Sequence, residues 1–318
     1  MEKIDLGSRQ FAVIAMSLFA ALCVSPFIVY RIAEKNYFIA AFDIMLTITC
    51  ISFSYLINTE RKAEIGARIL TLLASIEVIF IVYTEGYAQA YWIFPVMIAM
   101  YFINKPALTL WTNIIVLMAI IPKIYSSAHE MEFLTIISSI VVTNVFVFIF
   151  AYANSIQKNR MYKLAWFDGL TGINNRRALD KSFDLIRDEG VQVSIIAIDI
   201  DNFKNINDTY GHAIGDRVLI ETVEAIKPNI RATDNIYRYG GEEFVLVAFE
   251  TDYENAKIIA EKLRTIVEDH QYTDGIGVTI SLGVTSMKMG EDPLSCFDRS
   301  DQALYQAKKA GKNRTHYI

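Results

Sequence analysis

The chain has 318 residues, enough for two domains of ordinary size, and its formal net charge is −5. A chain without a basic field lacks what nucleic-acid binding usually needs, so the composition argues against a DNA- or RNA-binding protein. The three cysteines, Cys23, Cys50 and Cys296, stand far apart, which excludes a disulfide framework and a zinc-binding spacing.

Charged residues are distributed unequally between the two halves. Residues 1–157 contain 9 Lys and Arg and 10 Asp and Glu, whereas residues 158–318 contain 21 and 25. The first half also holds six apolar runs, most of them with the roughly 17 to 25 residues that a transmembrane helix needs. The runs are Phe11–Tyr30, Tyr37–Ile57, Ala67–Tyr83, Tyr87–Ile103, Pro106–Ile121 and Phe133–Tyr152. We expect an all-α, six-helix transmembrane sensory domain over residues 1–153; the alternative is a helical soluble core.

Loop charges predict the orientation, because Lys and Arg gather on the cytoplasmic side of a membrane. With the N-terminus inside, Arg31, Lys35 and Lys123 face outward. The inner set is larger: Lys3, Arg9, Arg61, Lys62, Arg68, Lys105, Lys158, Arg160 and Lys163. We therefore expect a multi-pass protein of the bacterial inner membrane with both termini in the cytoplasm.

Two ionisable residues lie well inside the expected spans, Asp43 in the second and Glu77 in the third. Both are at a depth of roughly 10 Å from the outer surface at the helical rise per residue. Intramembrane carboxylates are costly and usually face a polar interior. The pair predicts either an outward-opening pocket for a small ligand or ion (a cation, a proton or an amine) or two protonated carboxyls that brace a pair of helices.

The sixth run continues into residues 154–165 without Pro or Gly. We expect the helix to extend past the membrane as a signalling helix, with the C-terminal domain over residues 166–318. The apolar positions of the linker are too few for a convincing heptad, so coiled-coil pairing stays open.

The C-terminal half alternates helical and strand patterns. A turn-rich segment over 168–177 leads into a helix over 178–187, and an apolar run over 193–198 predicts a buried strand that ends at Asp199, Ile200 and Asp201. A calcium loop is not favoured there, because the Gly and Glu spacing of an EF-hand is missing. Helices are expected over 211–226, 253–268 and 294–310, with a strand over 277–285. This order predicts an α/β domain with a sheet packed against helices.

A predicted hairpin over residues 237–247 lies at the centre of this half. Gly240 and Gly241 suit the central positions of a type I′ turn, which both need positive φ. The missing side chains leave room for a phosphate, and Glu242 could hold a hard cation that bridges it. The alternative is an ordinary surface hairpin with acidic residues.

The strand end and the hairpin together predict chemistry on phosphates. Asp199 and Glu242 could share divalent cations, and three lysines, Lys204, Lys308 and Lys312, could neutralise phosphates. Such a set of carboxylates and lysines is suited to two-metal phosphoryl or nucleotidyl transfer.

The C-terminal half also resembles the GGDEF family of diguanylate cyclases, which condense two GTP into cyclic di-GMP. The resemblance covers about residues 166–318 and rests on several motifs in the family's order. They are DGLTGINNRR, DIDNFKNINDTYGHAIGD, RATDNIYRYGGEEF and ALYQAKKAGKNR. It implies a fold like that of nucleotide cyclases and polymerase palms, with two Mg²⁺ per active site, or Mn²⁺ in their place.

The resemblance also assigns roles to residues. The metal ligands would be Asp199, the Ile200 carbonyl and Glu242, and the guanine would be bound by Asn207 and Asp216. The phosphates would be lined by Phe203, Lys204, Gly240, Lys308 and Lys312. Catalysis would use Glu242, Lys204 and Glu243, the last as a candidate for deprotonating the attacking hydroxyl. From its own position, His212 is a candidate general base or substrate-binding residue, the alternative being a structural or polar-network role at the start of its helix.

Departures from the family pattern are small. Glu242 replaces the Asp for which the family is named, Ile173 replaces a usual Leu, and Lys312 replaces an Arg, which changes a forked contact to a point charge. The complete metal and guanine set favours an enzyme. The alternative is a non-catalytic membrane receptor for GTP or cyclic di-GMP, which would be free to lose Glu242 or Lys204.

Symmetry and a second motif predict assembly and regulation. One nucleotide site per domain and a two-fold symmetric product call for a homodimer, under the control of a signal at the membrane domain. Arg231 and Asp234 match the family's inhibitory product site, since they suit a phosphate and a guanine edge. Lys262 or Arg264 of a second protomer could complete that site. The alternative is an exposed turn with a weak ion pair.

Overall fold

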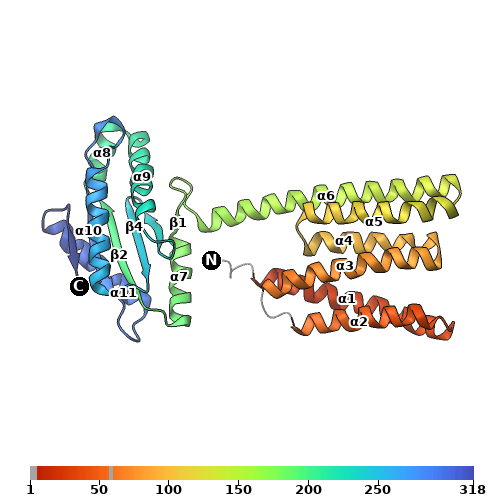
Figure 1. Ribbon diagram of the computed structural model, residues 1–318. Coiled ribbons are helices and arrows are strands. Elements are labelled where there is room, and N and C mark those ends of the chain that lie inside the picture. Colours follow the sequence, from red (N-terminus) through yellow and green to blue (C-terminus); the bar gives the residue numbers. More distant parts are fainter. Residues whose placement is uncertain (1–5, 57–59) are drawn as a thin grey trace. The chain divides into compact units, whose positions relative to one another are not determined.

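The computed structural model describes residues 6–56 and 60–318, and the chain divides into two units, Met1–Gln157 and Lys158–Ile318 (Figure 1). Lys3 of the predicted inner charges and Ile57 at the end of the second predicted run lie outside the described residues, as do the side chains of Arg9 and Arg61. Each unit is described here by itself.

The described part of the first unit is helical. Its elements are α1 (Leu6–Ala33), α2 (Tyr37–Leu56), α3 (Glu60–Glu85), the 3-10 helix η2 (Tyr87–Trp92), α4 (Ile93–Ile103), α5 (Pro106–Ser127) and α6 (Glu130–Trp166). Among the described residues, four helices are long and apolar enough to cross a membrane: Val13–Ala33, Lys62–Glu85, Pro106–Ser127 and Glu130–Trp166. The prediction of six spans is therefore confirmed only for four.

The other two predicted spans are shorter apolar helices, Tyr37–Ser52 and Tyr87–Ile103. The second of these is not one continuous α-helix, because its first six residues, which follow Gly86 with its φ of 98°, form η2 before α4 begins at Ile93. Glycine tolerates the φ that Gly86 takes, and Gly86 lies between the third and fourth predicted runs, where the sequence placed a boundary.

Large apolar side chains are exposed along these helices, including Phe11, Trp111 and Phe146. Inside the unit, one apolar cluster joins α1, α2 and α3 with Ile103 of α4, and a second joins α3 to η2, α4, α5 and α6. Exposed apolar surface of this extent is what a helical unit in contact with lipid requires.

A buried polar contact ties α6 to its neighbours. The Asn144 side-chain oxygen accepts a hydrogen bond from the Tyr101 hydroxyl of α4 at 2.8 Å and one from the Asn113 amide of α5 at 3.2 Å. Because polar groups in an apolar unit need such partners, Asn144 fixes the rotation of α6 against α4 and α5.

Helix α6 continues through residues 154–165, so the predicted helical extension is confirmed. Ile156, Met161 and Leu164 are exposed there. Their pairing with a second copy stays a prediction.

The second unit is an α/β domain. Its elements are β1 (Asn174–Asn175), α7 (Arg176–Glu189), β2 (Val193–Ile200), α8 (Phe203–Tyr210), α9 (His212–Ile226), η3 (Lys227–Asn229), β3 (Asn235–Gly240), β4 (Glu243–Phe249), α10 (Tyr253–Asp269), η4 (Thr273–Gly275), β5 (Ile280–Ser286), α11 (Pro293–Lys309) and β6 (Thr315–Tyr317). The six strands form one mixed sheet in the order β1-β3-β4-β2-β5-β6. The predicted class, with a central sheet flanked by helices, is confirmed.

Side-chain alternation along β2 explains the layers. Ile196 and Ile198 pack with α9 and α10 on one face of the sheet, whereas Val193 and Ile195 pack with α7 and α11 on the other. Both faces are covered, which is why β2 reads as a continuous apolar run. Helix α11 approaches β5 so closely that a Cβ at Gly283 would lie 2.1 Å from the Ser300 carbonyl oxygen.

The hairpin differs from the expected turn. Gly240 is the last residue of β3 and pairs with Glu243, so the central turn residues are Gly241 and Glu242. Only Gly241 of the two glycines has positive φ, at 45°. The turn is therefore shifted by one residue from the predicted Gly-Gly centre, with a bulge between Arg238 and Gly240. The shift places Glu242 in the turn itself.

Candidate functional site

The end of β2 meets the β3–β4 turn. Strands β2 and β4 are antiparallel, and Asp199 lies opposite Glu243 in their register. The Ile200 amide donates a hydrogen bond to the Glu242 carbonyl oxygen at 3.3 Å. The pairing thus brings together the backbone of Asp199, Ile200 and Glu242, the three residues predicted to bind metal.

Where the end of β2 meets the β3–β4 turn, acidic charge exceeds basic charge. Asp199 is only 6% exposed, and its carboxylate lies 2.7 Å from the Lys308 Nζ of α11. Burial raises the pKa of Asp199 to about 6; Lys308 opposes the rise, while the charges of Glu242 and Glu243 add to it. A bound cation would relieve this excess of negative charge.

The donor set fits a hard divalent cation. Carboxylate oxygens of Asp199 and Glu242 with the carbonyl of Ile200 are the ligands that Mg²⁺ prefers. Among the described residues, no group of three or more His, Cys, Asp or Glu side chains could hold a metal on its own. Mg²⁺ commonly uses one or two carboxylates and completes its shell with water and substrate phosphates, so these residues suit a metal that arrives with a phosphate ligand.

The start of α8 offers backbone donors to a phosphate. No side chain caps this helix, and its N-cap residue Asn202 has a φ of 56°. Phe203 is buried in the core, so only its backbone can serve the phosphate role predicted for it. Lys204, next in the helix, is exposed. The Lys312 ammonium donates a hydrogen bond to the Asn202 side-chain oxygen, which brings a second predicted phosphate ligand to the same place.

The two predicted guanine residues meet at the corner between α8 and α9. Asn207 is half-buried and its side chain lies over Gly215; a Cβ on Gly215 would be 1.9 Å from Asn207 Oδ1. Asp216 follows directly in α9 and is exposed. His212 is exposed at the first position of α9. Gly215 is a residue that the sequence analysis missed, although its place before Asp216 could have signalled it.

Asp201 was named only as part of the strand end, but it anchors the C-terminal loop. Its carboxylate accepts hydrogen bonds from the Thr279 hydroxyl at 2.8 Å, the Ser281 hydroxyl at 2.6 Å and the Asn313 amide at 2.9 Å. The loop that these bonds hold carries Lys312. Asp201 therefore positions a predicted phosphate ligand without facing the phosphate itself.

A second contact that the sequence did not reveal holds the β3–β4 turn in place, and we call it the Arg238 clamp. Arg238 donates two hydrogen bonds to the Gly241 carbonyl oxygen, at 3.0 and 2.8 Å, and one to Asp168 Oδ1 at 2.9 Å. Asp168 also accepts from the Thr171 amide and hydroxyl. Burial raises the pKa of Asp168, but the bonds from Thr171 and Arg238 outweigh it and hold that pKa below its usual value. Asp168 follows α6 by two residues, so the clamp joins the beginning of the domain to its turn.

The predicted inhibitory pair is only partly free to bind a ligand. Arg231 is exposed, whereas Asp234 is 6% exposed and its two oxygens accept from the amides of Arg231 and Phe249, both at 3.3 Å. Asp234 thus also holds the turn before β3.

The two residues proposed to complete that site from a second protomer already have partners within their own chain. Arg264 makes ion pairs with Glu261 and Glu268, and Lys262 donates to the Asn229 carbonyl oxygen. Either residue would have to give up these contacts to reach a neighbour.

Comparisons with known proteins agree on the second unit. Residues 165–314 match the family described as "Diguanylate cyclase, GGDEF domain". Response regulator PleD of Caulobacter vibrioides is 42% identical over 161 residues, which cover 48% of this chain and 36% of that protein. Diguanylate cyclase VdcA of Vibrio cholerae is 38% identical over 164 residues, covering 50% of this chain and 48% of that protein.

Among solved structures, the coiled coil and GGDEF domain of DgcB from Caulobacter crescentus, in complex with c-di-GMP, is 28% identical. The match covers 53% of this chain and 94% of that chain, with a TM-score of 0.49. The chain thus matches less than half the length of PleD and of VdcA, and the family match lies in its C-terminal half.

The clamp generates a prediction about the turn. Arg238→Gln removes the donors to Gly241 and Asp168, so the amides of residues 240–244 should exchange with deuterium about tenfold faster. Hydrogen exchange with mass spectrometry on the full chain measures this. Arg187→Gln is the matched control, because Arg187 pairs with Asp184 and Asp292. Unchanged exchange over 240–244 would show that Arg238 does not hold the turn.

Proposed function

We propose that this chain, whose residues 165–314 belong to the GGDEF family, is a membrane-bound diguanylate cyclase that condenses two GTP into cyclic di-GMP and pyrophosphate. The observation that carries the proposal is the β2–β4 register, which joins Asp199, Ile200 and Glu242 beside the uncapped start of α8. Relatives named diguanylate cyclase support it. The four long apolar helices support a location in the membrane.

Each condensation forms a bond between a 3′ oxygen of one GTP and the α-phosphorus of the other, and breaks the bond to the leaving pyrophosphate. Asp199, the Ile200 carbonyl and Glu242 would hold two Mg²⁺ or Mn²⁺ ions, which when bound acidify the 3′ hydroxyl and offset charge on the pyrophosphate. Glu243, half-buried opposite Asp199, is the candidate to accept the hydroxyl proton.

The lysines and the turn would bind the phosphates. Lys204 and the first amides of α8 would face them from one side, and Gly240, which has no side chain, would let them approach the turn. In the structure the Lys308 ammonium pairs with the Asp199 carboxylate. A metal ion bound to Asp199 would leave the Lys308 ammonium free for a phosphate oxygen. Lys312, held near Asn202, adds a further positive charge.

Two such domains would have to meet, because the product joins two nucleotides symmetrically. We propose a homodimer in which the helical continuation of α6 passes a signal from the membrane unit to the cyclase. In this arrangement residues 1–153 sense the signal, residues 154–165 are the signalling helix, and residues 166–318 carry the chemistry. Both termini would lie in the cytoplasm.

The direct test of the activity is the product. Purified full-length protein incubated with GTP and Mg²⁺ should form cyclic di-GMP, identified by mass spectrometry. Glu242→Gln should abolish turnover, since it removes one metal ligand while keeping the size of the side chain. Glu254→Gln, an exposed change on α10, is the control. Turnover above about a tenth of wild type in Glu242→Gln would remove Glu242 from the metal site.

Guanine recognition generates a second prediction. Asp216 would accept the N1 and N2 hydrogens that adenine lacks, with Asn207 beside it. Gly215→Ala would push the Asn207 side chain away, so the KM for GTP should rise at least about tenfold. Gly277→Ala is the matched control, because no atom lies within 4 Å of a Cβ there. If both variants keep the wild-type KM, Asn207 does not bind the substrate.

We further propose that cyclic di-GMP inhibits the enzyme at Arg231 and Asp234. The exposed guanidinium of Arg231 suits a forked contact with a phosphate or a guanine edge. Asp234 links this site to the hairpin, because it bonds the end of β4, and β4 begins beside Glu242. The coupling must be reciprocal, so dimers engaged with substrate should bind the product more weakly.

Arg231→Ala should raise the plateau of cyclic di-GMP formed in vitro and leave the initial rate nearly unchanged. The reason is that Arg231 lies outside the metal site and acts only on bound product. Progress curves with and without added cyclic di-GMP measure both quantities. Equal inhibition of variant and wild type by added product would contradict the assignment.

A further inference from the structure

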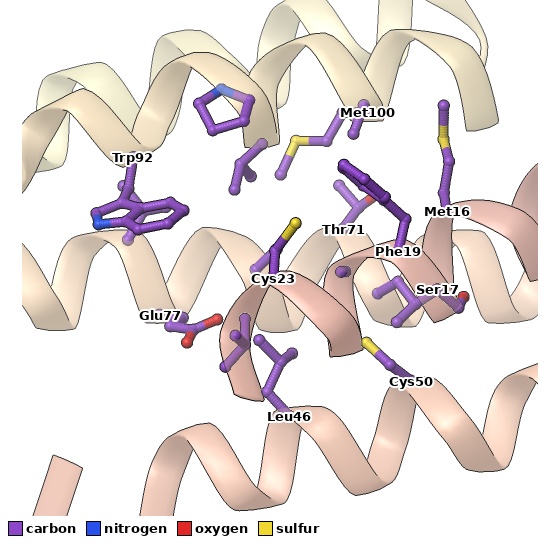
Figure 2. Close-up of a pocket in the computed structure, with 18 of the residues that line it drawn as sticks. Met16, Ser17, Phe19, Cys23, Leu46, Cys50, Thr71, Glu77, Trp92 and Met100 are labelled. Atoms are coloured by element: carbon purple, nitrogen blue, oxygen red, sulfur yellow. The ribbon is translucent and has the colours of Figure 1, made fainter. Parts of the chain in front are cut away.

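A cavity of about 440 Å³ lies within the first unit, among α1, α2, α3, η2 and α4 (Figure 2). Small-molecule sites usually have volumes of roughly 300 to 1,000 Å³. On α1 the lining residues extend from Val13 to Phe27. At the rise of an α-helix this stretch spans about 21 Å, so the cavity is elongated along the helices.

The two ends of the cavity differ in chemistry. Figure 2 shows Trp92 and Glu77 toward one end and Met16, Phe19 and Thr71 toward the other. Thr71 at the second end already accepts a hydrogen bond from Asn104. An apolar wall cannot replace the water around a small inorganic ion, so most of this volume calls for an apolar occupant.

Two carboxylate side chains, Asp43 and Glu77, line the first end. Asp43 of α2 accepts hydrogen bonds from the Arg31 guanidinium of α1 at 2.7 and 2.6 Å, and its side chain is 2% exposed. The Glu77 carboxyl of α3 lies within hydrogen-bonding reach of Asp43. One guanidinium faces two carboxylates, so a second positive charge or a proton must neutralise the remaining one.

Aromatic rings adjoin these carboxylates. Phe27 and Trp92 both line the cavity, with ring centroids 5.1 Å apart and planes at 84°. Aromatic faces attract organic cations, and a carboxylate beside them adds charge recognition. An anionic ligand would face the Glu77 carboxylate without a cation between them, because Arg31 already pairs with Asp43.

We propose that this cavity binds an organic ammonium ion with an elongated apolar body. The ammonium group lies at Glu77 and Asp43 beside Trp92, and the apolar body extends along α1 toward Val13. The sequence left open a pocket for a cation, a proton or an amine and, alternatively, two protonated carboxyls that brace a pair of helices; the length and apolar lining of the cavity favour the amine. This binding does not depend on the cyclase activity proposed above.

Full-length protein in phosphatidylcholine nanodiscs tests the proposal with tritiated dodecylammonium at pH 7. Wild type should bind it saturably, and unlabelled dodecylammonium should displace it at least about tenfold better than dodecanol or dodecyl sulfate. Equal displacement by the three competitors would show an apolar cavity without recognition of the cation. Absence of saturable binding would also overturn the proposal.

Variants locate the site. Glu77→Gln keeps the size of the side chain but removes its charge, and Ala74→Phe fills the cavity from the same helix; each should weaken binding at least about tenfold. Glu85→Gln is the matched control, since Glu85 also belongs to α3 but bonds Asn36 outside the cavity. Wild-type affinity in a folded Glu77→Gln variant would overturn the proposal. If that variant fails to fold, Ala74→Phe and the competitor series decide.

Discussion

The antiparallel pairing of β2 with β4 is the constraint on which the second unit depends. Its register sets Asp199 opposite Glu243 and joins the Ile200 amide to the Glu242 carbonyl. Covering both faces with helices buries β2 completely, and this burial is also what raises the pKa of Asp199. The same packing that stabilises the sheet therefore buries a carboxylate that pairs with Lys308 and lies near Glu242 and Glu243, an excess of negative charge that a metal ion would offset.

Segments outside the sheet complete the site, and either polar contacts or the absence of a side chain lets each segment keep its position. Asp201 fixes the C-terminal loop, Arg238 fixes the turn, and Gly215 leaves space for Asn207. None of these three residues needs to touch a substrate. They explain how exposed segments can hold side chains in place without packing into the core.

The sequence predicted the long elements well, because apolar periodicity signals α7, α9, α10, α11 and β2 directly. It missed α8, which is only eight residues long, and it centred the turn one residue too early because positive φ is needed at Gly241 alone.

In the first unit, hydropathy could not reveal that the fourth predicted run begins as the 3-10 helix η2 and only then becomes α4. The tie from Arg31 to Asp43 also escaped prediction, because it joins two helices. Contacts such as Arg238 with Asp168 depend on tertiary geometry, which spacing along the chain does not encode.

The measurement closest to the central claim is the affinity for Mn²⁺ in the presence of a GTP analogue with a non-cleavable α–β bridge, followed by electron paramagnetic resonance. The account predicts that Asp199→Asn and Glu242→Gln each weaken Mn²⁺ binding at least about tenfold. Wild-type Mn²⁺ affinity in either folded variant would contradict a shared metal site.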